Sequence, residues 1–358
     1  MQMKKWFVSD VHIGLDFKPD PKHPGYHDYN WLSDKERAEF ASFIQAAIDD
    51  KEPLQLILLG DTFDNWVCPV DRMPPSFEEI FTAPCNTQIV TLLNTLCSTP
   101  DKEVYILPGN HDMGLTEEIV KNAFPKMVFA GSANNDSCFM SGRLRAEHGS
   151  AHTLFNSPDP MNNPGTRLPL GYFITRVVAT RTNRTGKSNR EVVKYIDDLL
   201  EAIGPQTLSQ SVFEAVLEEA KLAENTEILM HEPCGKITAA EVKKKYAGLY
   251  DQWASAKGSG PAFKAMMAEI GYLGDIADRL CKKKGTNLVV FGHSHEWVLD
   301  KDSWFVDDRI YANCGCWCDN NCPRTFVEVD PGKDGKKQRV SVKEWKDGKI
   351  SVLKTETL

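Results

Sequence analysis

The 358-residue sequence lacks several features that would place it in a membrane or an export pathway. No stretch approaches the ~20 consecutive apolar residues of a membrane-spanning helix. The N-terminal residues have no apolar signal-peptide core and no small-residue cleavage site, and they run directly into the polar segment 9–12. We therefore expect residues 4–9 to form a first core strand and the protein to be cytoplasmic. The ten cysteines then need not form disulfides.

An excess of basic residues is also missing. The chain has 42 Lys and Arg against 50 Asp and Glu, a formal net charge of −8. Proteins that bind duplex nucleic acid more often carry a basic face, so nucleic acid is not the favoured partner. A phosphorylated substrate stays compatible with this charge, because bound metal ions can dominate the local field. The length indicates one large domain, or a core with a big insertion.

The first third of the chain alternates between short apolar runs and helical patterns. Buried strands are predicted at 4–9, 54–59 and 104–107. One helix is predicted from Ser33, which forms a capping-box pattern with Glu36, and a second helix is predicted over 86–98. Between them, a Pro-rich loop is expected over 67–85. This alternation is typical of an α/β fold.

The rest of the chain has a helical part and a strand-rich part. Residues 137–147 predict a hairpin that turns at Ser141-Gly142 and leads to His148. A mainly helical cap insertion is expected over 151–285, including one helix over 262–280. Further strands are predicted at 288–291, 325–329, 339–345 and 350–354, with a turn at Asp347-Gly348. Residues 1–150 and 286–358 would then make up the core.

Five polar clusters follow the apolar strands. They are Asp10-x-His12, Gly60-Asp61-x-x-Asp64, Gly109-Asn110-His111-Asp112, Glu147-His148-Gly149 and Gly292-His293-x-His295. Carboxylate, imidazole and amide groups suit divalent cations such as Mn, Zn, Fe and Mg, and none of the clusters offers a thiolate. A carboxylate can bridge two cations, and the glycines allow sharp turns at strand ends. The set therefore predicts a two-metal site.

In order and spacing the clusters resemble those of the calcineurin-like metallophosphoesterase superfamily, over about 1–150 and 286–330. The resemblance implies a four-layer α/β/β/α sandwich with two divalent metal ions. Manganese is favoured, with zinc, iron or magnesium as alternatives. The implied ligands are Asp10, His12 and His295 for the first ion, Asp61 as the bridge, and Asn110, His148 and His293 for the second.

The resemblance also implies a reaction. A metal-bridging hydroxide would hydrolyse a phosphate mono- or diester, or a pyrophosphate, by in-line attack. His111 would assist the leaving group, Asp112 would orient His111, and Asp64 would play a similar supporting role. His231, which follows an apparent strand at 227–230, is the alternative to His148. We favour His148 because it ends a clear hairpin and precedes a glycine.

The layout is most similar to the UDP-diacylglucosamine pyrophosphohydrolases of lipid A synthesis, which place a helical lid between the same two motifs. The chain departs from them at His111, where many have Arg, and at Ser150, where Asp is usual. Such a pyrophosphohydrolase is therefore one alternative function. A non-catalytic scaffold with the same fold is another, although such proteins tend to lose the catalytic histidine or some ligands. The cap favours a small or medium phosphorylated substrate.

Three further features have alternative interpretations. The cysteines at 314, 316, 318 and 322 lie close enough in sequence to bind zinc, but small buried structural cysteines are favoured. The loop of Trp66 either lines the substrate pocket or is a rigid surface loop. Arginine suits phosphate recognition, yet arginines on a cap are more often solvated. The arginines concerned are Arg167, Arg176, Arg181 and Arg184.

Overall fold

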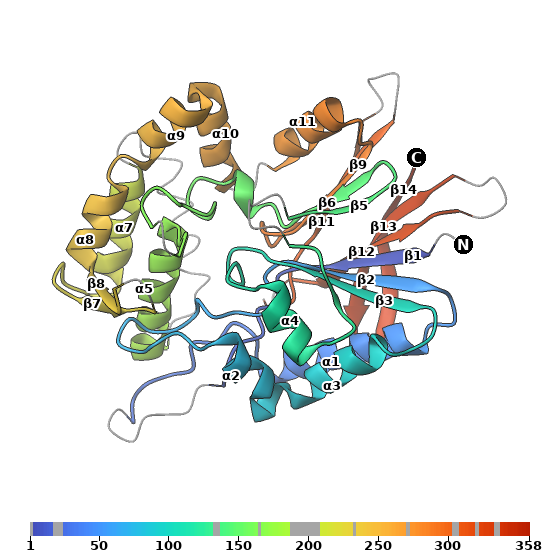
Figure 1. Ribbon diagram of the computed structural model, residues 1–358, viewed down its shortest axis with the longest axis horizontal. Helices are drawn as coiled ribbons and strands as arrows, with labels where there is room; N and C mark the ends of the chain where they lie inside the picture. Colours follow the sequence, from blue (N-terminus) through green and yellow to red (C-terminus); the bar gives the residue numbers. More distant parts are fainter. Residues whose placement is uncertain are drawn as a thin grey trace.

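Two β-sheets that pack face to face form the centre of the protein (Figure 1). The computed structural model describes residues 3–16, 24–131, 137–163, 166–186, 208–231, 234–269, 273–302, 308–318, 322–332 and 337–358. The first sheet has the strand order β14 (Lys349–Thr357), β13 (Arg339–Lys346), β12 (Arg324–Asp330), β1 (Lys4–Val8), β2 (Leu54–Leu59), β3 (Lys102–Leu107) and β4 (Val128–Phe129). The second has the order β10 (Trp297–Asp302), β11 (Arg309–Cys314), β9 (Leu288–Phe291), β6 (Leu144–Ala146) and β5 (Phe139–Ser141).

The apolar strands are buried on both faces, which explains why they lack an alternating pattern. In β1, Trp6 and Val8 point toward the helices that cover the first sheet, whereas Phe7 points toward the second sheet. In β9, Val290 faces the first sheet and Phe291 faces a covering helix. Because successive side chains of a strand point to opposite faces, such strands need apolar residues at every position.

Helices cover the outer face of each sheet. The first sheet is covered by α1 (Asp34–Asp49), α2 (Phe77–Thr82), α3 (Thr87–Leu96) and α4 (Glu117–Ala123), with the short η1 (Pro84–Asn86). The second is covered by α11 (Gly274–Lys284), whose Ile276 and Leu280 pack with Val289 and Phe291. Helix, sheet, sheet and helix are thus stacked in that order, and the expected α/β/β/α sandwich is confirmed.

A second group of helices lies to one side of the sandwich (Figure 1). It contains α5 (Leu170–Thr185), α7 (Leu208–Glu219), α8 (Ala239–Tyr246), α9 (Leu249–Lys257) and α10 (Ser259–Glu269), with the hairpin β7 (Glu227–Leu229) and β8 (Lys236–Thr238). Phe173, Phe213 and Tyr246 belong to its own hydrophobic core. Since α11 packs on the sandwich instead, we propose that the cap ends near residue 269 and not at 285. Among the described residues, no helix is both long and apolar enough to cross a membrane.

Two local expectations were wrong. The loop expected over 67–85 contains α2, which begins after Ser76 in a capping box with Glu79. The surrounding prolines obscured this helix in the sequence. The single helix expected over 262–280 is two helices, because α10 ends at Glu269 and α11 begins at Gly274. The capping box at Ser33 and Glu36 is confirmed.

Truncation of Phe7 tests the packing between the sheets. This side chain is 0 % exposed and its ring lies 5.9 Å from that of Phe139. Phe7→Ala should lower the free energy of unfolding by about 3–5 kcal/mol, because it removes buried apolar area and leaves a cavity. Urea unfolding measures the change. Val352→Ala, at a position 58 % exposed in β14, should change stability by less than about 0.5 kcal/mol. Equal stability of the two variants would contradict the assigned packing.

Candidate metal centre

Parallel strands of both sheets deliver the predicted ligands to one edge of the sandwich. Strands β1, β2 and β3 run parallel, and so do β6 and β9. The residues that follow these strands are Asp10 and His12, Asp61, Asn110, His148, and His293 and His295, in that order. Ligands of α/β proteins bind beyond the carboxyl ends of parallel strands. All seven predicted metal ligands therefore stand where such a site is expected.

The backbone at this edge is strained. Five of the seven residues, namely Asp10, His12, Asp61, His293 and His295, have φ between 49° and 69°. Residues other than glycine rarely adopt this left-handed conformation, and it persists mainly at functional sites. Gly109 and Gly292 allow neighbouring segments to lie very close to the backbone. A Cβ on Gly109 would overlap Asp61, and a Cβ on Gly292 would overlap Ser9. The turns thus hold the ligands at the cost of local strain.

Asp61 lies between two groups of histidines. Its Oδ1 accepts a hydrogen bond from the backbone N–H of His111, at 2.8 Å. Its Oδ2 lies 3.2 Å from Nε2 of His148 and 3.9 Å from Nε2 of His12. The candidate ligand atoms of Asp61, His148 and His293 lie within 4.8 Å of one another, and so do those of His12, Asp61 and His111. Asp61 is shared by both groups, as a bridging carboxylate would be.

The carboxylate of Asp10 is suited to bind a cation together with His12 and His295. Its Oδ2 accepts the backbone N–H of His293, at 2.9 Å. Its Oδ1 is buried and accepts no hydrogen bond from the described part of the chain. Nε2 of His295 lies 3.4 Å from this oxygen, and Nε2 of His12 lies 4.0 Å from it. Buried polar atoms are rarely left without partners, and an oxygen flanked by imidazole nitrogens suits a borderline divalent cation.

His148, and not His231, lies among the other candidate ligands. The carbonyl of Leu59 lies 3.0 Å from Nδ1 of His148, so Nδ1 donates to this carbonyl and Nε2 points toward the other candidate ligands. Nε2 faces Oδ1 of Asn110, at 3.1 Å. His231 instead donates a hydrogen bond to the carbonyl of Pro74, at 2.8 Å.

Asn156 and Glu269 connect the cap to this ligand set. Nδ2 of Asn110 donates to Oδ1 of Asn156, at 3.3 Å. Nδ2 of Asn156 in turn donates to Oε2 of Glu269 in α10, at 3.0 Å. This chain of contacts turns Oδ1 of Asn110 toward His148 and supports its use as a ligand. Sequence patterns gave no signal for it, because the three residues come from distant segments.

Of the two carboxylates expected to support the site, Asp64 contacts the histidines and Asp112 does not. Oδ2 of Asp64 lies 2.9 Å from Nδ1 of His111 and 2.7 Å from Nδ1 of His12. Asp112, which we expected to orient His111, instead accepts backbone N–H groups through both oxygens. These donors belong to Gly109, Asp61, Thr62 and Phe63. That expectation was wrong, because Asp112 holds the two ligand-bearing turns together and Asp64 orients both histidines.

The cluster concentrates charge in a buried volume. Burial opposes ionisation of Asp64, but His111 and His12 outweigh it and hold the pKa of this carboxyl well below its usual range. Burial likewise opposes protonation of His148, yet Asp61 and Asp10 raise its pKa to about 9. Burial and the nearby His148 lower the pKa of His293 to about 3. Ionised carboxylates beside imidazoles match the ligand chemistry of two divalent cations.

Two tryptophans pack against the histidines. The ring of Trp66 lies 4.7 Å from that of His111 and 5.6 Å from that of Tyr172 in the cap. Trp66 is 1 % exposed, so it is a packing residue between core and cap and not an open pocket wall. The ring of Trp31 lies 4.5 Å from that of His12 and 5.1 Å from that of His111. Trp31 lies in a polar loop region, and nothing in the sequence singled it out.

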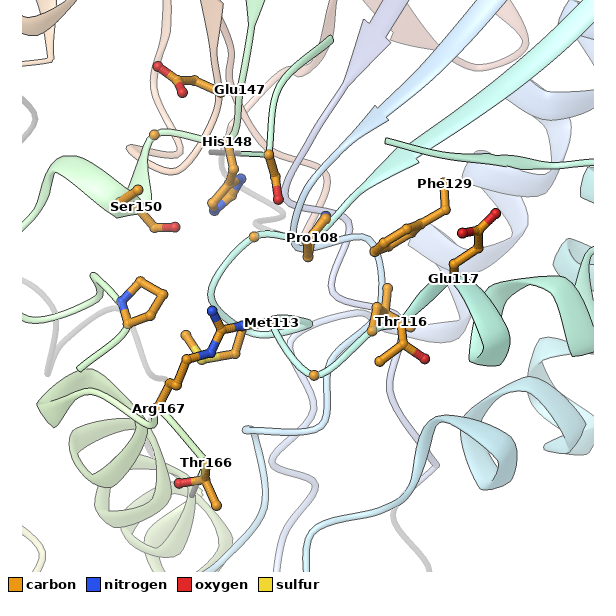
Figure 2. Close-up of a pocket in the computed structure, with 17 residues that line it drawn as sticks. Pro108, Met113, Thr116, Glu117, Phe129, Glu147, His148, Ser150, Thr166 and Arg167 are labelled. Carbon is orange, nitrogen blue, oxygen red and sulfur yellow. The ribbon is translucent and has the colours of Figure 1, made fainter. Parts of the chain in front are cut away.

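A cavity of about 550 Å³ opens beside His148. Figure 2 shows His148 and Arg167 approaching the same space from opposite sides, with Ser150 at one edge. Arg167 comes from the loop that precedes α5, and its backbone is left-handed, with φ of 58°. A charged group from the cap therefore faces the cavity next to a candidate metal ligand.

Arg176, Arg181 and Arg184, the other cap arginines considered in the sequence, do not line this cavity. Arg176 is fully buried and donates to carbonyl oxygens, including those of Cys68 and Pro69. Arg181 pairs with Glu219, at 2.8 Å. Arg184 is exposed near the end of α5. Arg176 and Arg181 thus have structural roles, whereas Arg167 lines the cavity.

Comparison with known proteins identifies the family. The sequence model of the calcineurin-like phosphoesterases matches residues 3–297, so the chain belongs to this family. Membership supports a metal-dependent phosphoesterase. No curated protein matches the sequence.

Two solved structures show distant similarity. Vacuolar Protein Sorting 29 from Cryptosporidium parvum is 18 % identical, with a TM-score of 0.19, over 24 % of this chain and 43 % of its own. GAP50 of Plasmodium is 12 % identical, with a TM-score of 0.38, over 100 % of this chain and 89 % of its own. Similarity at this level says nothing about activity.

Replacement of Asp64 tests its contact with two histidines. In Asp64→Asn, an NH2 group replaces one of the two acceptor oxygens. Either the histidines lose their shared acceptor or the backbone N–H groups of Trp66 and Val67 do. Affinity for Mn²⁺ or Zn²⁺ should fall by about 10–100-fold, the usual cost of losing a residue that orients a ligand. Titration calorimetry measures it. Asp71→Asn, at an exposed position, is the control and should bind normally. Unchanged affinity in Asp64→Asn would refute the role given to Asp64.

Proposed function

We propose that the protein hydrolyses a phosphate mono- or diester, or a pyrophosphate, with two divalent cations. The first would be held by Asp10, His12 and His295, the second by Asn110, His148 and His293, and Asp61 would bridge them. The position of Asp61, close to His12 on one side and to His148 and His293 on the other, carries this proposal. The oxygen of Asp10 without a hydrogen-bond donor supports it.

The protein groups around the ions have distinct tasks. Bound cations acidify a water for attack on phosphorus and offset charge on the phosphoryl oxygens. The backbone N–H of His111 fixes Oδ1 of Asp61, which leaves Oδ2 facing the histidines. Asp64 holds the rings of His12 and His111 in place. The N–H groups bound by Asp112 keep the turns after β2 and β3 at a fixed separation.

The contacts of His111 support a role as proton donor. Its Nδ1 contacts Asp64, at 2.9 Å, so Nε2 is the nitrogen available to a substrate. Burial lowers the tendency of this imidazole to charge, but Asp64 and Asp61 outweigh burial and raise its pKa. An imidazolium held in this way can protonate a leaving oxygen. His111 would therefore act on the leaving group, as we expected from the sequence.

The cavity beside His148 supports a substrate of small or medium size. Its volume of about 550 Å³ lies within the range of pockets that bind drug-sized molecules. A nucleotide or sugar phosphate is of this size, whereas a lipid with two long acyl chains is larger. The cavity thus favours the general phosphoesterase over a UDP-diacylglucosamine-type pyrophosphohydrolase. Arg167 would bind a phosphate or another anionic group of the substrate.

Removal of the His111 imidazole separates catalysis from metal binding. His111→Ala should lower kcat by about 10²–10⁴-fold, the usual contribution of a general acid, and should retain two ions per chain. A Mn²⁺-supplemented panel of aryl phosphates, bis-aryl phosphodiesters and nucleotide-sugar pyrophosphates provides the assay, and elemental analysis gives the metal content.

His231→Ala is the matched control, because His231 lies outside the candidate ligand set. This variant should keep both turnover and metal. Unchanged turnover in His111→Ala would remove His111 from the mechanism, and loss of metal would make it a ligand. A metal-loaded wild-type protein without activity on any substrate would favour the scaffold alternative.

Arg167 provides a test of the cavity. Arg167→Ala should raise KM by about 10–100-fold, because a charge-assisted hydrogen bond contributes about 1.5–3 kcal/mol. Metal content should not change, because the side chain belongs to the cap. Steady-state kinetics on the best substrate of the panel measures KM. Arg184→Ala, on the exposed end of α5, should behave like the wild type. An unchanged KM in Arg167→Ala would place the substrate elsewhere.

A further inference from the structure

The segment after β11 brings cysteine side chains to the edge where the metal ligands meet. Trp317 anchors this segment, because its backbone N–H donates to the carbonyl of Asp10, at 3.0 Å. Its indole is 0 % exposed, packs against the rings of Phe40 and Phe43, and donates through Nε1 to the carbonyl of Thr325. The residues on either side of Trp317 are therefore held at a fixed place next to Asp10.

Cys318 follows this anchor and lies beside two candidate ligands of the first cation. Its Sγ and the ligand nitrogens of His12 and His295 all lie within 4.8 Å of one another. The two Nε2 atoms are themselves 3.4 Å apart, so both rings point to the same place. Cys316, on the other side of Trp317, contacts the side chains of Cys318 and Cys322 and is buried.

We propose that Cys318 supplies a thiolate ligand to the cation held by Asp10, His12 and His295. The inference builds on the proposed two-cation site and adds a ligand to one half of it. When the sulfur–metal bond forms, the S–H bond breaks and its proton passes to solvent. The cysteines of this segment would then be neither a separate four-thiolate zinc site nor purely structural.

A thiolate changes which metal this position prefers. Soft sulfur ligands favour zinc, iron and cobalt, whereas oxygen-rich sites suit manganese and magnesium. The second position, with Asn110, His148 and His293, has no cysteine in the candidate groups among the described residues. The two halves of the site would therefore differ, and the first would select a softer cation than the manganese expected from the family resemblance.

Cobalt substitution reports sulfur ligation directly. The full-length protein, prepared metal-free and loaded with Co²⁺, should show a thiolate-to-cobalt charge-transfer band in the near ultraviolet. Cys318→Ser should retain the visible cobalt bands, which report that metal is bound, and should lose the charge-transfer band. Its affinity for Zn²⁺ should fall by roughly tenfold or more, comparable to the loss of a supporting residue. Cys322→Ser is the matched control from the same segment and should keep the band.

Alkylation of the wild-type protein gives a second readout that needs no substitution. Zn²⁺ should protect Cys318 from iodoacetamide, as measured by peptide mass spectrometry, while the exposed Cys234 of the cap should react equally with and without Zn²⁺. Bound cobalt without a charge-transfer band, a band that survives in Cys318→Ser, or equal loss in Cys322→Ser would overturn the assignment. A protein that binds no cobalt at all would overturn both this assignment and the two-cation site.

Discussion

The side chain and backbone of Asp10 join three parts of the molecule at one point. Asp10 follows β1 of the first sheet, and its Oδ2 accepts an N–H from His293 of the second sheet. Its carbonyl accepts an N–H from Trp317, which holds the cysteine-bearing segment. Only Oδ1 is left without a protein donor among the described residues. Asp10 therefore links the two sheets at the site and keeps one oxygen for a ligand.

The strands and the ligand positions could be predicted from the sequence for a physical reason. Strands buried on both faces must be apolar at every position, so β1, β2 and β9 stand out, and the polar cluster after each one marks its carboxyl end. The same reasoning could not distinguish Asp64 from Asp112 as the partner of His111. That choice depends on which carboxylate the left-handed turns direct inward and which one they direct to the backbone.

Contacts between the cap and the core could not be predicted at all. Asn156 contacts Asn110 across 46 positions, and Trp66 contacts Tyr172 across 106. The sequence separation of neither pair indicates a contact, because each contact depends on how the cap packs against the sandwich. The division of residues 262–280 into two helices has the same origin, because α10 packs with the cap and α11 with the second sheet.

The place where the cap joins the core has an evolutionary consequence. The chain leaves the sandwich after β6 and returns to it through α11, which leads into β9, and β6 and β9 are hydrogen-bonded neighbours. Neighbouring strands lie about 5 Å apart, so the sheet itself holds the ends of the insertion together. The entropy cost of a longer segment grows only with the logarithm of its length. Lineages of this fold can therefore lengthen or exchange the cap, and with it the range of substrates, while His148 and His293 keep their places.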